Sequence, residues 1–211
     1  MALLASWTLP MPGGALAAVA RLPPPGEQRF RVYYGDMSRD LVVAEIDYRL
    51  QHDGDAYEVG TRGKAVGMVA MFYSGVLVQT SMGRIGPHGL LPEQYSERRG
   101  KRPERVVRFD HARRKMIGLG NPPEVDLVPG TQDRLSVFYQ VGLLARSRPA
   151  LLERGQRFTM PLASMKGIDR ASFTAGGAEP VETARGRVPA VRLTVRNEAI
   201  RTIRRSMSGW A

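Results

Sequence analysis

Residues 42–61 read VVAEIDYRLQHDGDAYEVGT, and this stretch decides the fold class. From Val42 to Leu50, apolar side chains at even positions alternate with mostly polar side chains at odd positions. Such alternation is typical of a strand that buries one face and exposes the other. The pair Asp53-Gly54 separates this run from a second alternating run that begins at Tyr57. An Asp-Gly pair in this position predicts a hairpin, so we expect antiparallel strands.

The same alternation recurs along most of the chain. It predicts further strands near residues 29–34, 76–84, 90–99, 105–110, 157–162 and 191–196. Residues 66–78 are almost continuously apolar, which fits a short buried helix or two bent strands equally well. No repeat of solenoid length is present, so we expect one mainly β domain over residues 29–197, built as a single curved antiparallel sheet or a partly open barrel.

One buried helix is expected at about residues 131–146. Pro129 and Gly130 precede it, and either Thr131 or Asp133 would serve as its N-cap. The apolar side chains that follow fall on two stripes at helical spacing, so most of the helix surface should be buried. We therefore expect the sheet to wrap around this helix.

The chain is strongly basic, with a formal net charge of +11 at pH 7. Such a charge predicts attraction to nucleic acid, anionic lipid or acidic polysaccharide. Residues 96–115 alone contain nine Arg or Lys, but Glu97, Glu104 and Asp110 are interleaved with them and Glu93 closely precedes them. Few aromatic residues accompany these cations, so a row of base-stacking rings is not expected. We interpret the stretch as the solvated face of a sheet, with nucleic acid the less favoured partner.

The residue types needed for catalysis do not converge in the sequence. There is no Cys, which excludes disulfides and thiolate chemistry. His52, His88 and His111 lack the spacing of metal ligands and lie in expected turns. Neither a phosphate-binding loop nor a nucleophile elbow occurs. We therefore predict no catalytic residue, metal or cofactor, and a protein that is not an enzyme.

An apolar binding surface is the remaining candidate site. Large apolar side chains gather in the run 66–78 and on the expected helix. The candidate lining residues are Met68, Met71, Phe72, Phe138 and Tyr139, with Tyr73 beside them. The alternative is that these side chains are ordinary core.

The N-terminal stretch differs in composition from the rest. Residues 1–20 are mostly apolar and end in Ala18-Val19-Ala20, which fits the small-residue rule for signal-peptide cleavage. The stretch has no Lys or Arg and contains Pro10 and Pro12, so a disordered leader is the alternative. The same prolines argue against a transmembrane span. Residues 21–28 are rich in proline and should form a stiff spacer.

Several stretches resemble a bacterial family known as domain of unknown function 3108. They read GLLPEQYSERR at 89–99, VVRFD at 106–110, PGTQDRLSVFY at 129–139 and ETARG at 182–186. The resemblance covers about residues 29–197. It implies an exported, mostly β protein of the cell envelope, broadly similar to the half-barrel lipoprotein carriers, and it implies no catalytic residues. On this basis we expect a periplasmic or otherwise exported protein.

Two hypotheses for function follow. The first is a non-enzymatic envelope protein that binds a lipid, an acyl chain or a partner segment on an apolar concave sheet, as the one-sided strands indicate. The alternative is a basic module that binds polyanions, including nucleic acid.

The C-terminal tail, residues 198–211, is basic and alternates poorly. The resembling family continues there with a strand that contains Val-Trp-Leu. With suitable codons for the neighbouring residues, a shifted frame across 205–211 would encode Ile-Asp-Val-Trp-Leu-Gly, and the single codons of Met207 and Trp210 fit this. We predict a frameshift after Asn197 and the loss of the last strands. An unpaired sheet edge beside Val191, Leu193 and Val195 would result.

Overall fold

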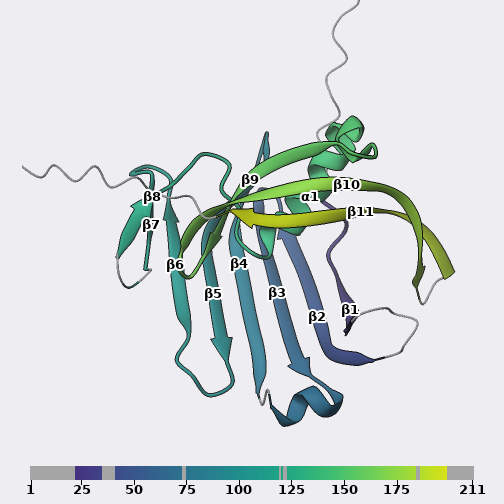
Figure 1. Ribbon diagram of the computed structural model, residues 1–211. Helices are drawn as coiled ribbons and strands as arrows, with labels where there is room; N and C mark the ends of the chain where they lie inside the picture. Colours follow the sequence, from purple (N-terminus) through teal and green to yellow (C-terminus); the bar gives the residue numbers. More distant parts are fainter. Residues whose placement is uncertain are drawn as a thin grey trace, which may run out of the picture.

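The computed structural model describes residues 22–34, 41–72, 75–118, 120, 123–183 and 186–198. The described chain is mainly β, as predicted, and its strands form two sheets (Figure 1). The larger sheet has the order β1-β2-β3-β4-β5-β6-β7-β8, and the smaller one has the order β11-β10-β9. The sheets do not close into a barrel.

The strands of the larger sheet follow one another as an antiparallel meander. They are β1 (Gly26–Tyr33), β2 (Val42–Asp53), β3 (Ala56–Ala65), β4 (Val76–Gly86), β5 (Gly89–Arg99), β6 (Arg105–Asp110), β7 (Lys115–Ile117) and β8 (Glu124–Asp126). A short 3-10 helix, η2 (Gly67–Met71), lies between β3 and β4. The hairpin predicted at Asp53-Gly54 is confirmed, since Asp53 pairs with Ala56 and Gly54 has a φ of 57°.

The smaller sheet contains β9 (Arg157–Ser164), β10 (Gly167–Thr183) and β11 (Gly186–Glu198). It crosses the larger sheet, and α1 (Ser136–Ser147) lies between the two (Figure 1). A second 3-10 helix, η3 (Pro149–Leu152), follows α1. The connection from β8 through α1 to β9 makes one isolated parallel bridge, Gln132 with Leu162. This long connection is why the strands form two sheets and not the one continuous sheet that alternation alone suggested.

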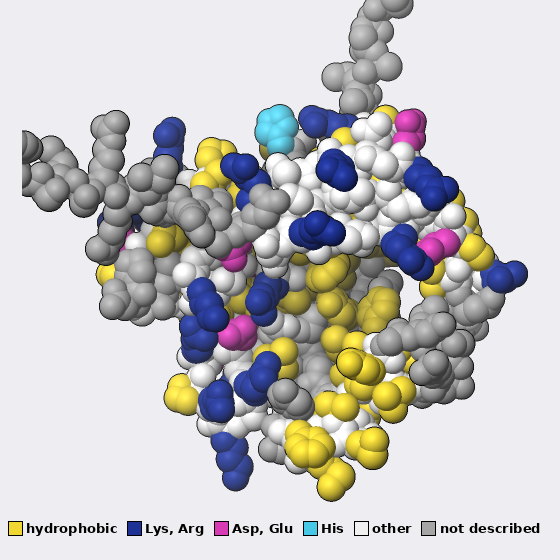
Figure 2. All heavy atoms as spheres, viewed as in Figure 1, with side chains coloured by type: hydrophobic (Ala, Val, Ile, Leu, Met, Phe, Trp, Pro, Cys, Tyr) yellow, Lys and Arg dark blue, Asp and Glu magenta, His cyan; other side chains and the backbone are white. Residues whose placement is uncertain are grey.

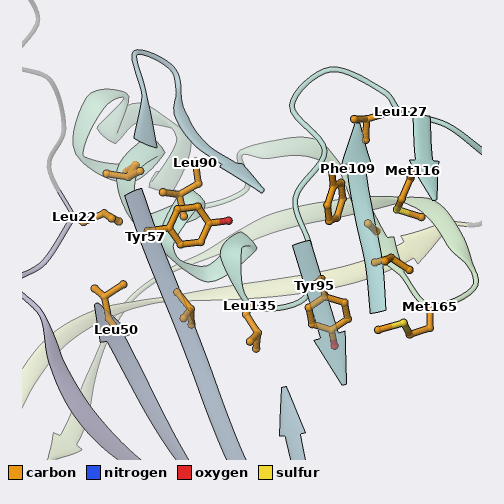
Figure 3. Close-up of a cluster of buried hydrophobic side chains, with 14 residues drawn as sticks. Leu22, Leu50, Tyr57, Leu90, Tyr95, Phe109, Met116, Leu127, Leu135 and Met165 are labelled. Atoms are coloured by element: carbon orange, nitrogen blue, oxygen red, sulfur yellow. The ribbon is translucent and has the colours of Figure 1, made fainter. Parts of the chain in front are cut away.

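The core occupies the space between α1 and the two sheets. The main cluster joins Leu50 and Tyr57 of the larger sheet to Leu135 at the start of the helix and to Leu143 within it (Figure 3). A second cluster joins Val137 of the helix to Phe173 of β10. The helix therefore contributes apolar side chains to both sheets, and this holds the sheets together.

The helix differs from its predicted form in two respects. It begins at Ser136, because residues 133–135 are held in a capping turn by Asp133, and Thr131 instead bonds to Val128. It is also less buried than expected, since only Ser136, Val137, Gln140 and Leu143 are buried. Phe138 is 61 % exposed because the sheets diverge on its side of the helix.

Three further predictions concern the ends of the domain. β1 begins at Gly26, and Leu22 packs into the core, so the proline-rich spacer partly belongs to the domain. The predicted signal peptide lies outside the described residues, as does the tail from residue 199 onwards. Within the described ranges β11 is an edge strand of the smaller sheet. The frameshift stays a prediction.

Candidate functional site

The candidate site is an open hollow between the two sheets. Beyond Thr174, the hairpin of β10 and β11 has no third strand and continues as a two-stranded arm. Figure 2 shows the hollow below the band formed by this hairpin, with hydrophobic side chains inside it and Lys and Arg on the band's outer face. We use "the hollow" for the space bounded by β1–β3, the Phe138 side of α1 and the inner face of β10 and β11.

Three aromatic rings line the hollow, each from a different element. Tyr48 of β2 stands edge-on to Phe30 of β1, with centroids 5.3 Å apart. On its other side Tyr48 stands edge-on to Phe138 of α1, with centroids 6.3 Å apart. Phe30 is 46 % exposed, so apolar ring surface faces solvent inside a concave part of the molecule. Exposed apolar surface of this kind is typical of binding sites for apolar ligands or partners.

The hairpin of β10 and β11 presents a matching apolar face. Phe173 of β10 packs on α1, and its cross-strand partner is Val195 of β11, so both side chains lie on the inner face. Alternation places Leu193 and Val191 on the same face. A register shift between Ala175 and Gly177, where Gly177 has a φ of 102°, interrupts β10 beside Arg154, which follows η3. Bulges of this kind bend strands, which accounts for the curvature of the arm.

The hollow becomes polar towards the middle of the larger sheet. One cross-strand row runs from Tyr48 on β2 to Arg105 on β6, through Thr61, Gln79 and Glu97. Its side chains form a chain of hydrogen bonds: Thr61 donates to Gln79, and Gln79 donates to the Tyr95 hydroxyl. The Tyr95 hydroxyl in turn donates to Glu97. These groups satisfy one another, so the site is apolar over β1–β3 and polar over β4–β6.

The structure separates the predicted lining residues into two groups. Phe138 and Tyr139 lie on α1, and Tyr48 beside Phe138 pairs with Thr61 of β3. Met68, Met71 and Phe72 lie on or just after η2, where they are 73 %, 81 % and 82 % exposed. Ala65, where β3 ends, is already roughly 13 Å along the strand from Thr61. The five side chains therefore do not form one lining, and Tyr73 lies outside the described residues.

A buried polar cluster fixes the start of the helix. Oδ1 of Asp133 accepts hydrogen bonds from the backbone N–H groups of Leu135 and Ser136, at 2.8 and 3.0 Å. Oδ2 accepts one from the Ser81 hydroxyl at 2.6 Å. Because Ser81 donates its hydrogen to Asp133, the Tyr57 hydroxyl 3.2 Å away must donate to Ser81. Burial raises the pKa of both Tyr57 and Asp133.

This cluster is closed to substrates. Ser81 and Asp133 are fully buried and Tyr57 is 3 % exposed. The cluster joins β3, β4 and the start of α1, so its role in the molecule is to position the helix. Sequence reasoning found Asp133 as a helix cap, but nothing local in the sequence indicated Ser81 or Tyr57 as its partners.

The histidines make local contacts to the backbone. A ring nitrogen of His52 lies 3.0 Å from the Pro23 carbonyl oxygen, and one of His111 lies 2.7 Å from that of Pro92. His88 and His111 lie in turns, as expected, whereas His52 belongs to the end of β2. In the part of the chain that the structure describes, no three His, Asp or Glu side chains gather as metal ligands do.

Three of the nine cations in the 96–115 stretch, Arg105, Arg113 and Lys115, pair with acids, so the interleaving of charges predicted part of the pairing. Arg105 lies 3.6 Å from Glu97, and Arg113 contacts Asp110. Glu93 instead pairs with Arg84 of the neighbouring strand, and Glu104 accepts a hydrogen bond from Ser96. On β1 and β2 the pairs Arg29–Asp47 and Arg49–Glu27 continue the pattern. The face of β1–β3 opposite the hollow therefore carries exposed ion pairs, whereas the Arg105–Glu97 pair lies on the hollow's own face.

A second depression, of about 640 Å³, lies on the Gln140 side of α1. Gln140 fastens the β4–β5 turn there, since its amide accepts from the backbone N–H of Leu90 and donates to the carbonyl of His88. Gln132 similarly donates to the carbonyl of Leu90. Among the described residues, Gln132 Oε1 is the buried side-chain polar atom that lacks a partner. The polar groups here hold the hairpin to the helix.

Comparison with known proteins assigns the chain to a family. Residues 29–210 match the family model described as Protein of unknown function (DUF3108). The chain belongs to this family. The resemblance inferred from the sequence over about residues 29–197 is thus confirmed, and the DUF3108 match extends further, across most of the tail. No curated protein and no solved structure matches the chain. Within the described residues of this DUF3108 protein, no helix has the length and apolar character needed to cross a membrane.

Proposed function

We propose that this protein is a non-enzymatic component of the cell envelope that binds an acyl chain, as part of a lipid or of a lipid-bearing partner, in the hollow between its sheets. The observation that carries the proposal is the exposed apolar lining of a concave surface. Phe138 belongs to the helix that forms the core, yet it is 61 % exposed and stands edge-on against Tyr48 at the wall of the hollow.

The shape and chemistry of the lining support an acyl chain. An elongated apolar ligand gains affinity from the area it buries, at roughly 25 cal/mol per Å². Rings from β1, β2 and α1 offer such area on one side, and Val191, Leu193 and Val195 of β11 offer it on the other. The polar row ending at Glu97 and Arg105 would accommodate a polar headgroup.

The proposal of a non-enzymatic role rests on where the titratable groups lie. Asp133 is fully buried, and its two carboxyl oxygens accept hydrogen bonds from the start of the helix and from Ser81. Glu97, the carboxyl nearest the hollow's polar row, pairs with Arg105 and accepts from Tyr95. These groups serve the fold, which supports binding over catalysis.

Ion pairing on the outer face of β1–β3 weighs against a polyanion-binding surface on those strands. Binding to nucleic acid requires cations that are free to replace counterions on phosphates. Arg29, Arg49 and Lys64 each lie within 4 Å of a carboxylate on an adjacent strand. Periplasmic or otherwise exported location is part of the proposal, since an envelope protein would meet lipids and acylated partners there.

The experiment that tests the proposal is native mass spectrometry of protein purified without detergent, followed by extraction and identification of any bound molecule. The expected result is a population carrying one copurified acyl-containing molecule, which organic extraction removes and an added fatty acid restores. A protein that copurifies with no such molecule, and takes up none after extraction, would contradict the proposal.

A further inference from the structure

One end of the larger sheet combines exposed apolar side chains with unpaired cations. The end of β1, the start of β2, η2 and the β5–β6 turn all lie at this end, because Tyr33 pairs with Val42 and Leu77 pairs with Arg99. Figure 2 shows hydrophobic side chains gathered at the lower tip, where Figure 1 places the short helix after β3. We define the apolar tip as Tyr34, Leu41, Met68, Met71 and Phe72.

The side chains of the apolar tip are large and unusually exposed. Met68, Met71 and Phe72 are 73 %, 81 % and 82 % exposed, Tyr34 is 74 % and Leu41 is 45 % exposed. η2 has no buried residue, so its packing within the fold does not explain the choice of Met and Phe. A contiguous exposed group of this kind marks an interaction surface.

The β5–β6 turn brings cations beside this tip. The backbone N–H of Gly100 donates to the carbonyl of Val76, which lies just after the η2 loop, at 2.8 Å. A Cβ on Gly75 would lie only 3.0 Å from the Cα of Gly100, so the two segments touch. Arg99, Lys101 and Arg102 project from this turn; we call these three residues the basic turn.

The acidic side chains that the structure describes at this end, Glu45, Glu97 and Glu104, are already engaged. Glu45 pairs with Lys64 at 3.2 Å, and Glu97 pairs with Arg105 at 3.6 Å. Glu104 accepts a hydrogen bond from Ser96 at 2.8 Å. Within the described ranges, the three cations of the basic turn have no acidic partner. Their charge is therefore available to an external anion.

We propose that the apolar tip and the basic turn together form a docking surface for an anionic lipid bilayer. Met and Phe side chains would enter the interface between headgroups and acyl chains, as amphipathic membrane anchors do. Tyr34 would lie at the headgroup level, where aromatic side chains are enriched. Arg99, Lys101 and Arg102 would face the phosphates, whose charge complements theirs. This surface is separate from the hollow, and the proposal does not depend on what the hollow binds.

The test is co-sedimentation of the full chain with two kinds of vesicle, one of phosphatidylcholine alone and one with half of it replaced by phosphatidylglycerol. The expected result is strong binding to the anionic vesicles and weak binding to the neutral ones. The double variant Met71→Ser, Phe72→Ser should weaken binding to anionic vesicles tenfold or more. The double variant Lys101→Gln, Arg102→Gln should weaken it by about fivefold for each charge removed.

Two controls keep the result specific. Arg154→Gln with Arg157→Gln removes the same charge near η3 and β9, away from the tip, and should leave vesicle binding nearly unchanged. Phe138→Ser removes an exposed ring from the hollow and should also leave it unchanged. All of the substituted side chains of the tip are highly exposed, so these variants should fold, as circular dichroism can check.

Either of two outcomes overturns the proposal. One is failure of the wild-type chain to bind anionic vesicles at low salt, as expected if the tip contacts a protein partner. The other is binding that the tip variants reduce no more than the Arg154/Arg157 control does. A wild-type chain that binds anionic vesicles but takes up no acyl chain would contradict the proposed function and leave the docking surface standing.

Discussion

Phe138 of α1 stands edge-on to Tyr48 of β2, with ring centroids 6.3 Å apart and an angle of 89° between the ring planes. The contact joins the only α-helix of the described chain to the second strand of the larger sheet. It also leaves one side of the Phe138 ring open to the hollow, since 61 % of the residue is exposed. An exposed ring at the junction of two sheets would be available to a ligand, whereas a ring that served only to pack the core would be buried.

Replacing Phe138 by Ser should reduce acyl binding and leave the fold intact. Ser and Phe have similar helix propensities, and the lost edge-to-face contact is worth no more than about 1 kcal/mol of stability. Chemical denaturation should therefore show nearly unchanged stability, while a fluorescent fatty acid should bind at least fivefold more weakly. Phe72→Ser is the matched control, because Phe72 is more exposed and lies outside the hollow. Equal effects of the two substitutions on acyl binding would contradict this assignment.

Asp133→Ala should destabilise the protein strongly. The substitution removes the acceptor for the backbone N–H groups of Leu135 and Ser136, and for the Ser81 hydroxyl. Losing a helix cap and leaving buried donors unpaired should lower the free energy of unfolding by about 2–4 kcal/mol. Urea denaturation measures this directly. If Asp133→Ala lowers the free energy of unfolding no more than an Asp→Ala substitution at an exposed position does, the cluster does not hold the helix start.

The same carboxyl predicts a pH dependence of stability. Burial raises the pKa of Asp133 above its ordinary value, so the folded chain retains this proton to higher pH than the unfolded chain does. Its contribution to stability is fully present below about pH 4, the range of the unfolded group, and is lost as pH rises through the folded pKa. Asp133→Asn cannot titrate and keeps one oxygen to accept from the helix N–H groups.

The free energy of unfolding of the wild type, minus that of Asp133→Asn, should therefore fall between pH 3.5 and pH 7. Other carboxylates titrate equally in both proteins, so the difference isolates Asp133. A difference that rises with pH would mean that the hydrogen bonds to the carboxylate outweigh its burial.

Two glycines in the larger sheet should respond oppositely to alanine. Gly83 lies at a register shift between β4 and β5, where a Cβ would come within 2.2 Å of the Leu91 carbonyl oxygen. Gly83→Ala should cost about 1–3 kcal/mol of stability through this overlap. Gly60 of β3 has no atom within 4 Å of its Cβ position, so Gly60→Ala should be neutral or stabilising by up to about 1 kcal/mol. Thermal unfolding of both variants measures the effect. Equal shifts in melting temperature would show that the backbone around Gly83 moves to accommodate the added Cβ.

The part of the fold that could be predicted is the part that short-range patterns control. Alternation around Asp53-Gly54 predicted β2, β3 and their hairpin, because a strand with one buried face needs that period. Asp133 could be identified as a helix cap because capping acts over a few residues. The basic run was interpreted as a solvated face because its acids alternate with its cations, and Arg98, Lys101, Arg102 and Arg108 are indeed exposed.

The rest depends on contacts between distant segments. Ser81 became a partner of Asp133 only through the tertiary fold, and nothing near position 81 indicates this. An apolar helix and an apolar run such as 66–78 suggest core in any sequence, yet Phe138 and Phe72 are exposed. Which apolar side chains a fold leaves uncovered follows from how far its sheets diverge, and alternation contains no information on that distance. The candidate site was therefore found only in part.

The measurement that tests the central claim most directly is a titration of delipidated protein with a polyene fatty acid whose fluorescence rises in apolar surroundings. We predict saturable binding to one site, displacement by an unlabelled fatty acid, and weaker binding for Phe138→Ser but not for Phe72→Ser. A fluorescence signal that never saturates, or one that both variants lower equally, would contradict the claim that the hollow binds an acyl chain.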